Sequence, residues 1–373
     1  MTSLSNGHKS SSSLTITDKV IKSFEPVKTF NYHKGASITS LDFDDSGQYL
    51  ISAGIDKSIQ LYDVHKGVHH NDIQSQKYGA HLARFTHFEL NCLYASTPAA
   101  DKNIDNAIRY LSLSNNLYLR YFKGHKDQVT SIEVHPVLDL FLSASLDRTV
   151  KLWDLRSTSP VGNLDVGQPT VIAFDPRGIV FCVGKCPCPS TGAGVGVVAF
   201  YDTASFDKKP FLEVEIQVLA GQSWNKLEFS NNGKLLLIST DSYEHYVVDA
   251  FLGQLLTTLQ IVSDTSHTGY NGDWMTFKYP YSGSASFSPC GKFVLVGSPQ
   301  MNVLAFDLTN LKHTDGNTRS VSDLDNPKTL RPFQTLSTNQ GIPKIVAFNQ
   351  KLLTFATADS TVSLWQPKLP DPI

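Results

Sequence analysis

The sequence predicts an all-β protein, built as a ring of seven four-stranded sheets and therefore a seven-bladed β-propeller. Three observations support this prediction. Residues 118–156 split into four short runs rich in β-branched, aromatic and leucine residues, with turn-forming segments between them. A run that ends in a triplet such as Leu-Tyr-Asp or Leu-Trp-Asp, or a degraded form of it, recurs seven times at intervals of about 42 to 59 residues. The N-terminal part of the chain also holds one spare β-type run, which a closed ring requires.

Residues 118–156 are the clearest copy of the repeat. Its four runs are YLRYF, VTSIEVH, LFLSAS and TVKLWDL. Gly124 and His125 lie between the first two runs, and Trp153 and Asp154 end the last one. A Gly-His pair followed about thirty residues later by Trp-Asp, with β-type runs between them, is typical of the WD40 repeat. We therefore expect the WD40 form of the propeller.

The other copies follow in the same register. The last run of each copy ends, in chain order, at Asp63, Ser112, Asp154, Asp202, Asp249, Asp307 and Gln366. Upstream of most copies a run ends in a polar turn, as in LDFDDSGQYL or ASFSPCGKFV. Such turns need a positive φ, which glycine and asparagine tolerate best. Each copy supplies the outer strand of the preceding blade and three strands of its own, so residues 20–370 form one domain.

The ends of the chain explain how the ring closes. The last copy ends at TVSLWQP and leaves its blade without an outer strand. The segment EPVKTFNY, residues 25–32, is the spare run, and we expect it to pair on the outside of the last blade. This pairing removes a sheet edge that would otherwise be prone to aggregation. The serine-rich residues 1–17 are expected to form a disordered tail.

Composition narrows the function classes. The 373 residues are 41% hydrophobic and 18% charged, with a formal net charge of -2. This near-neutral balance argues against strong direct binding of nucleic acid through a basic face. No apolar run approaches the roughly 18 residues that a membrane-spanning helix needs, so no membrane partner is expected.

One group of polar residues resembles a Ser-His-Asp catalytic site. It comprises His125, Asp147, Trp153 and either Ser143 or Ser145. In WD40 blades these residue types form a buried hydrogen-bond chain that ties the Gly-His loop to the turn between the second and third strands. We expect this structural role, and we expect only this blade to carry the full set. No Gly-x-Ser-x-Gly nucleophile motif occurs in the chain, so no catalytic residue and no enzymatic activity are predicted.

Two clusters could be mistaken for metal or cofactor sites. His65, His69, His70 and Asp72 lie close together in sequence, in what we expect to be an exposed connection. The stretch FCVGKCPCPSTGAGVGVV places Cys182, Cys186 and Cys188 just before three alternating glycines. A phosphate-binding glycine loop needs a following helix, whereas a strand is expected here, and a structural zinc site needs four ligands. We therefore predict neither a metal nor a cofactor.

Elaborated loops indicate where partners bind. Three long loops, 97–106, 184–196 and 261–281, are expected on one face of the ring, and a fourth, 311–328, on the opposite face. Long loops on one rim of a rigid scaffold suggest recognition rather than catalysis. Two short turns share the first face. The candidate partner-binding residues are Ile55, Lys57, Leu146, Arg148, Trp224 and Trp274. For Trp274, a buried structural role and an exposed partner-binding role both remain open.

Irregular segments carry a closer resemblance. The second repeat lacks both Gly-His and Trp-Asp, and reads QKYGAHLARFTH at residues 76–87 and NAIRYLSLSNNLYLRYFKGH at residues 106–125. Together with LDRTVKLWDLRS, SFDKKPF and WNKLEFSNNGKLLLIST, this pattern resembles the WD-repeat-82/Swd-two family. That family is the WD40 propeller subunit of the COMPASS (Set-one) histone H3 lysine-four methyltransferase complex. The resemblance runs through all seven repeats, while the Cys/Gly loop and the serine-rich tail depart from it.

The resemblance implies a nuclear, non-catalytic scaffold. Its implied partner is the N-terminal region of the catalytic subunit of the histone methyltransferase. In fungi the same propeller also serves in the cleavage and polyadenylation factor, within a phosphatase-containing module that acts in mRNA 3'-end processing and transcription termination. Animal relatives join a protein-phosphatase-one complex and associate with the phosphorylated tail of RNA polymerase II. The alternatives are a propeller enzyme that uses a pocket on the loop-bearing face, and a WD40 adaptor of another nuclear complex, such as a ubiquitin-ligase substrate receptor.

Overall fold

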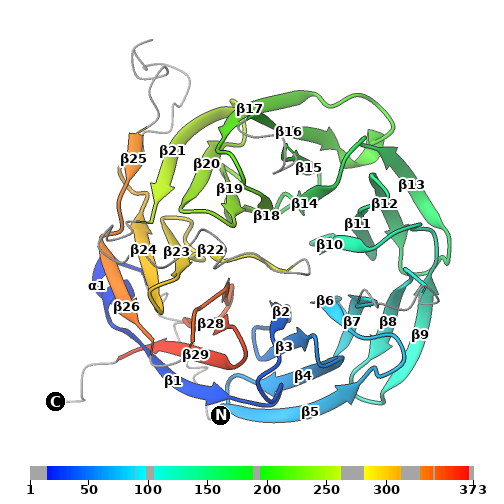
Figure 1. Cartoon of the computed structure of the whole chain (residues 1–373), viewed down its shortest axis with the longest axis horizontal. Coiled ribbons are helices and arrows are strands. Elements are labelled where there is room, and N and C mark those ends of the chain that lie inside the picture. Colours follow the sequence, from blue (N-terminus) through cyan, green and yellow to red (C-terminus); the bar gives the residue numbers. More distant parts are fainter. Residues whose placement is uncertain are drawn as a thin grey trace, which may run out of the picture.

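Seven sheets surround a central axis and form a closed ring (Figure 1). This computed structural model describes residues 15–88, 90–97, 105–187, 194–261, 281–311, 328–338 and 341–368. Each sheet is one blade, and neighbouring strands within a blade are antiparallel, with one exception described below. The predicted all-β class and the seven-bladed propeller are confirmed. Blades are numbered in chain order from the first sheet after the N-terminal strand.

Blades one to four are regular four-stranded sheets, with strand order following the chain from the axis outward. Blade one comprises β2 (Ile38–Phe43), β3 (Tyr49–Gly54), β4 (Ser58–Asp63) and β5 (Val68–Gln74). Blade two comprises β6 (His81–Phe85), β7 (Asn91–Ala95), β8 (Ile108–Ser112) and β9 (Leu117–Phe122). Blade three comprises β10 (Val129–Val134), β11 (Leu140–Ser145), β12 (Thr149–Asp154) and β13 (Pro160–Asp165). Blade four comprises β14 (Thr170–Phe174), β15 (Val180–Lys185), β16 (Gly194–Asp202) and β17 (Leu212–Val218), with a short 3-10 helix, η2 (Thr203–Ser205), after β16.

Blades five to seven depart from this simple chain order. Blade five comprises β18 (Trp224–Phe229), β19 (Leu235–Thr240), β20 (Glu244–Asp249), β21 (Gln254–Gln260) and a fifth strand, β25 (Lys328–Leu330). Blade six comprises β22 (Ala285–Phe287), β23 (Phe293–Ser298), β24 (Asn302–Asp307) and β26 (Gln334–Ser337). Blade seven comprises β27 (Ile345–Phe348), β28 (Phe355–Ala358), β29 (Val362–Pro367) and the N-terminal β1 (Phe24–Phe30).

The ring closes through the N-terminal strand, as predicted. β1 pairs antiparallel with β29, with Phe24 opposite Pro367 and Phe30 opposite Val362. Figure 1 shows the first and last strands side by side at the outer edge of blade seven. The strand occupies residues 24–30 rather than 25–32. Closure thus covers the edge of β29 with a strand from the far end of the chain.

A short helix before β1 was not predicted. α1 (Asp18–Lys22) is capped by Thr17, whose hydroxyl accepts a hydrogen bond from the Val20 amide at 3.4 Å. Ile21 is fully buried, in the cluster that joins blades six and seven. The predicted tail, residues 1–17, stays a prediction for residues 1–14, which lie outside the described residues. Among the described residues, no helix has both the length and the apolarity needed to cross a membrane.

The fifth strand of blade five was also not predicted. The connection 311–328 was expected to be a loop on the opposite face, but its end returns to blade five. There β25 pairs with β21 in parallel, with Thr257 opposite Lys328 and Leu259 opposite Leu330. Residues 312–327 of this connection lie outside the described residues. The outer edge of β21 is therefore covered by a segment of the same chain.

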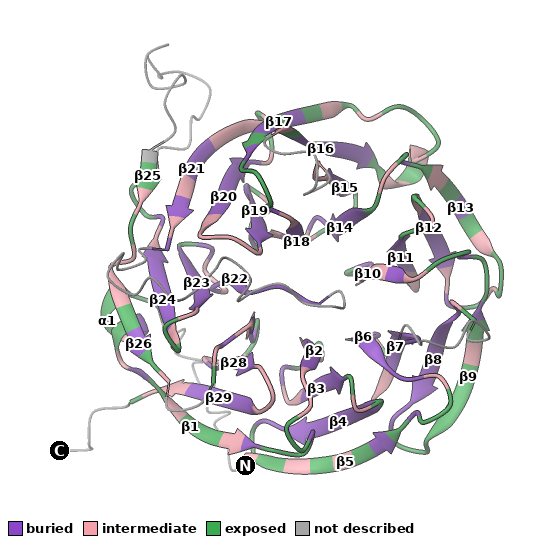
Figure 2. Cartoon of the chain, in the orientation of Figure 1, coloured by how far each residue is buried: buried purple, intermediate pink, exposed green. Residues whose placement is uncertain are grey.

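The core lies between blades rather than at the axis (Figure 2). Side chains alternate between the two faces of a strand, and both faces of each blade are covered by neighbours. In blade one, Ile51 and Leu61 pack towards blade two, whereas Leu50 and Tyr62 pack towards blade seven. Figure 2 shows buried inner strands and partly exposed outer strands. This packing holds the turns at the two ends of each blade in fixed positions, and those turns carry the candidate site residues.

Candidate functional site

The polar group predicted in blade three forms one continuous hydrogen-bond chain. His125 precedes β10, Ser143 lies on β11, Asp147 in the β11–β12 turn and Trp153 on β12. The Trp153 indole donates to the Ser143 hydroxyl at 2.8 Å, and this hydroxyl lies 2.7 Å from Nε2 of His125. Nδ1 of His125 lies 2.9 Å from the Asp147 carboxylate. The chain runs from the blade interior to a turn at its end.

The chemistry of the donors fixes the direction of this chain. The Asp147 carboxylate can only accept, so Nδ1–H of His125 donates to it. With the imidazole ring neutral, Nε2 of His125 accepts from the Ser143 hydroxyl, which itself accepts from the Trp153 indole. Burial lowers the pKa of His125, which favours this neutral form. Burial raises the pKa of Asp147, but hydrogen bonds from the Lys126 amide, the Thr149 hydroxyl and His125 outweigh it and lower the pKa to about 2.

The structure shows which of the two candidate serines belongs to the hydrogen-bond chain. Ser143 belongs to the chain, whereas the Ser145 hydroxyl donates to the Asp127 carbonyl at 2.9 Å and accepts from the Asp147 amide at 3.0 Å. Ser143 and Trp153 are fully buried. The serine hydroxyl is thus committed to its neighbours and sealed from solvent, which suits a structural tie rather than a nucleophile.

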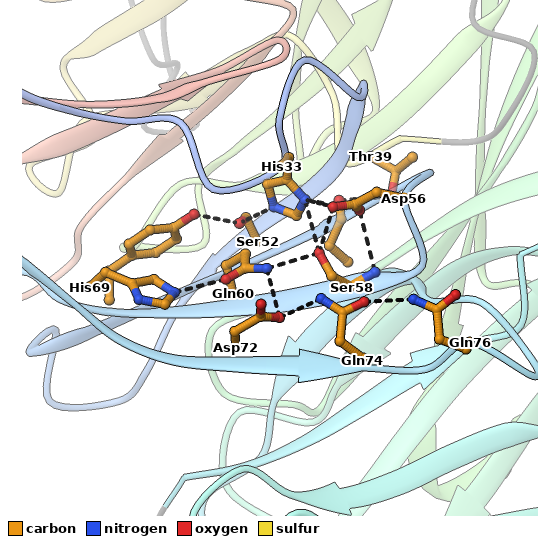
Figure 3. Close-up of polar contacts among 12 residues, drawn as sticks. His33, Thr39, Ser52, Asp56, Ser58, Gln60, His69, Asp72, Gln74 and Gln76 are labelled. Atoms are coloured by element: carbon orange, nitrogen blue, oxygen red, sulfur yellow. Dashed lines mark hydrogen bonds and ion pairs between the residues drawn. The ribbon is translucent and has the colours of Figure 1, made fainter.

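Blade one holds a second chain of the same design, so the expectation for a single blade was too narrow. His33 lies 3.0 Å from Asp56 through Nδ1 and 2.7 Å from the Ser52 hydroxyl through Nε2 (Figure 3). Ser52 lies 3.2 Å from the Tyr62 hydroxyl, so Tyr62 takes the place of Trp153. Sequence reasoning missed this chain because Tyr32 replaces the glycine before His33. The signal was the strand end Tyr62-Asp63, which falls where Trp153-Asp154 falls in blade three.

In blade one the chain continues towards the outer strand. The buried Gln60 amide donates to Ser58 at 2.9 Å and to Asp72 at 3.0 Å, and its oxygen lies 2.7 Å from His69 Nε2. Gln74 donates to Asp72, and Gln76 donates to Gln74 (Figure 3). The Ser58 hydroxyl lies 3.2 Å from His33 Nδ1, so the ladder links the buried His33 to exposed amides on β5 and just beyond it.

The histidine cluster that could have bound a metal does not converge. His69, His70 and Asp72 lie on β5, a strand rather than the predicted connection, while His65 precedes it. The His69 ring stacks on Tyr32 at 3.7 Å between centroids, and the His70 ring packs edge-on against Tyr49. Within the described ranges, no three His, Cys, Asp or Glu side chains are placed to hold a metal ion.

The cysteines of the Cys/Gly stretch point to different surroundings. Cys182 lies on β15 and is fully buried. The Cys186 thiol lies 3.4 Å from the Gln222 carbonyl, and burial raises its pKa to about 12. Cys188 lies outside the described residues. A protonated Cys186 thiol is a poor nucleophile and a poor metal ligand.

Four of the six candidate partner-binding residues are exposed at matching turns. Ile55 and Lys57 lie in the β3–β4 turn, and Leu146 and Arg148 in the β11–β12 turn. Lys57 and Arg148 share a φ of 67°, so the two turns have the same backbone shape. Both turns join the second and third strands of a blade, so both emerge on the same end of the ring. We call this end the top face.

Trp224 is not available to a partner, which corrects the prediction. It begins β18, is 6% exposed and packs in the cluster between blades four and five. A β-carbon on Gly196 would lie 2.5 Å from the Trp224 ring, and one on Gly184 would lie 3.1 Å from it. These glycines therefore make room for the indole, which gives the glycine pattern a packing role. Trp274 lies outside the described residues.

The central channel carries charged groups that sequence reasoning missed. A cavity of about 270 Å³ is lined by inner-strand residues, among them Asp42, Arg84, Glu133, Lys226 and Glu228. Arg84 bridges Asp42 at 3.1 Å and Glu133 at 2.5 Å, and Lys226 pairs with Glu228. Asp42 also accepts the Phe85 amide at 2.7 Å, which links blade one to blade two. The Arg84 pairs join three different blades, so no local sequence pattern reveals them, whereas Lys226 and Glu228 lie on the same strand, β18.

Comparison with known proteins shows which family the chain belongs to. The family described as WD domain, G-beta repeat matches residues 24–63 and 116–154. "Set1 complex component swd2" of Schizosaccharomyces pombe is 36% identical, over 94% of this chain and 99% of that protein. "COMPASS component SWD2" of Saccharomyces cerevisiae is 37% identical over 93% and 94%, and "WD repeat-containing protein 82" of Drosophila melanogaster is 34% identical over 95% and 98%. The chain belongs to the WD-repeat-82/Swd2 family of WD40 propellers.

Proposed function

We propose that this protein is the non-catalytic WD40 scaffold subunit of a COMPASS-type histone H3 lysine-four methyltransferase complex in the nucleus. One observation carries the proposal. Two relatives whose names state membership of the Set1 or COMPASS complex match nearly the whole chain at 36% and 37% identity. The match therefore includes the irregular second blade, whose sequence departs from the general WD40 pattern.

The geometry supports a scaffold role. The Ser-His-Asp group of blade three is buried and used up in internal hydrogen bonds, and the similar group in blade one ties its turn to the blade interior. Ile55 and Leu146 stand exposed on rigid turns of the top face. Exposed apolar side chains on fixed turns suit recognition of a partner without chemistry. We propose that the N-terminal region of the methyltransferase catalytic subunit binds this face.

Affinity purification from nuclear extract tests the proposal. The tagged chain should recover the Set1-type catalytic subunit, and the double variant Ile55→Glu/Leu146→Glu should lose it. Val137→Glu is the matched control, because Val137 is exposed in the β10–β11 turn at the opposite end of blade three. Failure of the wild-type chain to recover the methyltransferase contradicts the function. Recovery by the double variant contradicts only the assignment to the top face.

The same purification addresses the other roles that the family resemblance implies. Recovery of polyadenylation-factor or phosphatase-module subunits supports a second role in mRNA 3'-end processing and transcription termination. Recovery of the phosphorylated RNA polymerase II tail supports its proposed association. Ubiquitin-ligase subunits in place of all of these would favour the alternative reading of the chain as a substrate receptor.

A further inference from the structure

The outer strands of the blades differ in how their free edges are protected. Natural edge strands carry proline, charge or both, which discourages pairing with another chain. β1 carries Pro26 and Lys28, and β17 carries Glu213 and Glu215. β9, with the sequence LYLRYF, carries no proline, and Arg120 is its one charged residue. Its edge is the least protected of these three.

β9 also exposes an unusual amount of apolar surface. Leu117 is 60% exposed and Leu119 46%, and Tyr118 and Tyr121 are exposed beside them. Leu119 is the unpaired residue of a β-bulge, so Tyr118 and Tyr121, which would point to opposite faces of a regular strand, lie on a common face. The rings of Tyr118 and Tyr121 accordingly stack, with centroids 5.4 Å apart. The strand thus offers both backbone groups and apolar side chains to a partner.

A hollow of about 690 Å³ borders this strand. It lies against β9 and the loop that follows β12, and its described lining residues are Leu119, Arg120, Tyr121, Lys123, Thr158 and Ser159. Arg120 and Lys123 are cationic, and no acidic side chain is among these lining residues. Such a border favours a segment that carries carboxylates next to its apolar side chains.

Blade five shows what happens when such an edge is covered. There β25 adds to the outer strand β21 as a fifth strand. Leu256 is the unpaired bulge residue of β21, as Leu119 is of β9, yet it is only 5% exposed. It lies in the hydrophobic cluster against which Leu330 of β25 packs. This fold therefore accommodates a fifth strand at a blade edge, with a leucine buried beneath it.

We propose that β9 is a docking strand, to which an extended segment of a partner protein adds as a fifth strand of blade two. Backbone hydrogen bonds give affinity in this mode, and alternate side chains give specificity. The segment places an apolar side chain against Leu119 and Tyr121, and acidic side chains next to Arg120 and Lys123. The inference does not rest on membership of the methyltransferase complex, because it uses only the edge, the hollow and the charges of blade two.

A peptide-display library tests this proposal. Random decapeptides are selected on the purified full chain, and enriched sequences should alternate apolar residues with aspartate or glutamate. Leu119→Asp should weaken their binding by about tenfold or more, because it removes apolar contact and adds like charge. Val161→Asp is the matched control, since Val161 is the exposed bulge residue of β13 in blade three, and it should leave binding within about twofold.

Two further measurements keep the test decisive. Hydrogen exchange should show that the amides of Tyr118 and Tyr121 gain protection when an enriched peptide binds. Lys123→Glu, at an exposed position after the strand, should weaken binding by a similar factor and remove its salt dependence even if Leu119→Asp folds poorly. The proposal is overturned if no sequence is enriched, or if binding survives both variants. It is equally overturned if protection falls on the top-face turns, or if wild-type chains self-associate through β9.

Discussion

Blades one and three use the same hydrogen-bond chain with different ends. In blade three the chain begins at Trp153, whose indole N–H can only donate. In blade one it begins at Tyr62, whose hydroxyl lies 3.2 Å from Ser52 and can donate or accept. The group at the buried end of the chain is therefore an obligate donor in blade three and a hydroxyl in blade one. The familiar Trp-Asp signature marks only the version that begins at an indole, and a hydrogen-bond chain can persist where the signature is lost.

A second difference between the two blades lies in the polar pair that joins the third strand to the outer strand. Gln60 in blade one and Lys151 in blade three occupy the same strand position, and they face Asp72 and Asn163 respectively. Gln60 donates to Asp72 at 3.0 Å, and the Lys151 ammonium donates to Asn163 at 2.5 Å. The charged residue of the pair is therefore Asp72 on the outer strand in blade one, and Lys151 on the third strand in blade three. In blade one, Asp72 also accepts from the exposed Gln74, which in turn accepts from Gln76. In blade three, burial lowers the pKa of Lys151.

The largest expected effect comes from removing the central histidine. His125→Ala opens a cavity and removes a hydrogen-bond partner from both Ser143 and Asp147. Water cannot easily replace that partner at Asp147, because its side chain is only 7% exposed. We expect a loss of about 3 kcal/mol in the free energy of unfolding. His33→Ala should cost less, about 2 kcal/mol, because Asp56 is 23% exposed and water replaces its partner. Urea unfolding measures both, and equal losses would show that exposure of the carboxylate does not matter.

The second prediction compares the residues at the buried ends of the two hydrogen-bond chains, Trp153 and Tyr62. Trp153→Phe removes the obligate donor to Ser143 and part of a fully buried ring, at a cost of about 2 kcal/mol. Tyr62→Phe removes only a hydroxyl, and Ser52 keeps its bond to His33, so we expect about 1 kcal/mol. The comparison uses unfolding midpoints of the two variants in the same buffer. A Tyr62→Phe variant as unstable as Trp153→Phe would mean that the Tyr62 hydroxyl contributes as much to stability as the Trp153 indole.

Acid stability should distinguish the two carboxylates. The pKa of Asp147 is lowered from 3.8 to about 2, so its charge stabilises the fold above pH 3.8, and this contribution is lost as the pH falls towards 2. Burial raises the pKa of Asp56, but hydrogen bonds from His33 and Ser58 outweigh it, so this pKa is also lowered.

 The variants Asp147→Asn and Asp56→Asn should therefore each lose less stability than the wild type between pH 4 and pH 2, and Asp147→Asn should show the flatter profile. Thermal midpoints across this pH window measure the difference. A wild-type slope retained in Asp147→Asn would assign the acid sensitivity to other carboxylates.

The histidine of blade three adds a separate window at higher pH. Burial lowers the pKa of His125 below its ordinary value of 6.5, so the fold favours the neutral ring. Its contribution is complete above pH 6.5 and is lost as the pH falls below that value, in the same direction as for Asp147. As the pH falls, the loss of stability due to His125 begins near pH 6.5, before the loss due to Asp147, which begins near pH 3.8.

Much of the fold could be predicted from the sequence because its signals are local and repeated. Turn residues and β-type runs recur in every blade, and a missing outer strand at one end implies a spare one at the other. β25 escaped prediction because it is three residues long and pairs with Thr257, which is far away in the sequence. α1 escaped because five residues are too few to show a helical period.

The hydrogen-bond chain of blade three could be predicted because it lies within one blade, whereas the parts of the site that cross between blades could not. The top-face turns could be located because they follow from strand order alone. The burial of Trp224 depends on Gly184 and Gly196 in the neighbouring blade, and no pattern within β18 indicates it. The channel pairs of Arg84 with Asp42 and Glu133 likewise join three different blades. Local sequence patterns report on a blade, but not on what the next blade places against it.

The smallest expected effect marks where the blade-one ladder stops contributing to stability. Gln60 is fully buried and serves Ser58, Asp72 and His69, so Gln60→Ala should cost about 1 kcal/mol. Gln74 is exposed and donates only to Asp72, so Gln74→Ala should cost less than about 0.5 kcal/mol, because water takes over its hydrogen bond. Urea midpoints of the two variants decide the matter. A cost for Gln74→Ala equal to that for Gln60→Ala would mean that the ladder acts as one cooperative unit up to the protein surface.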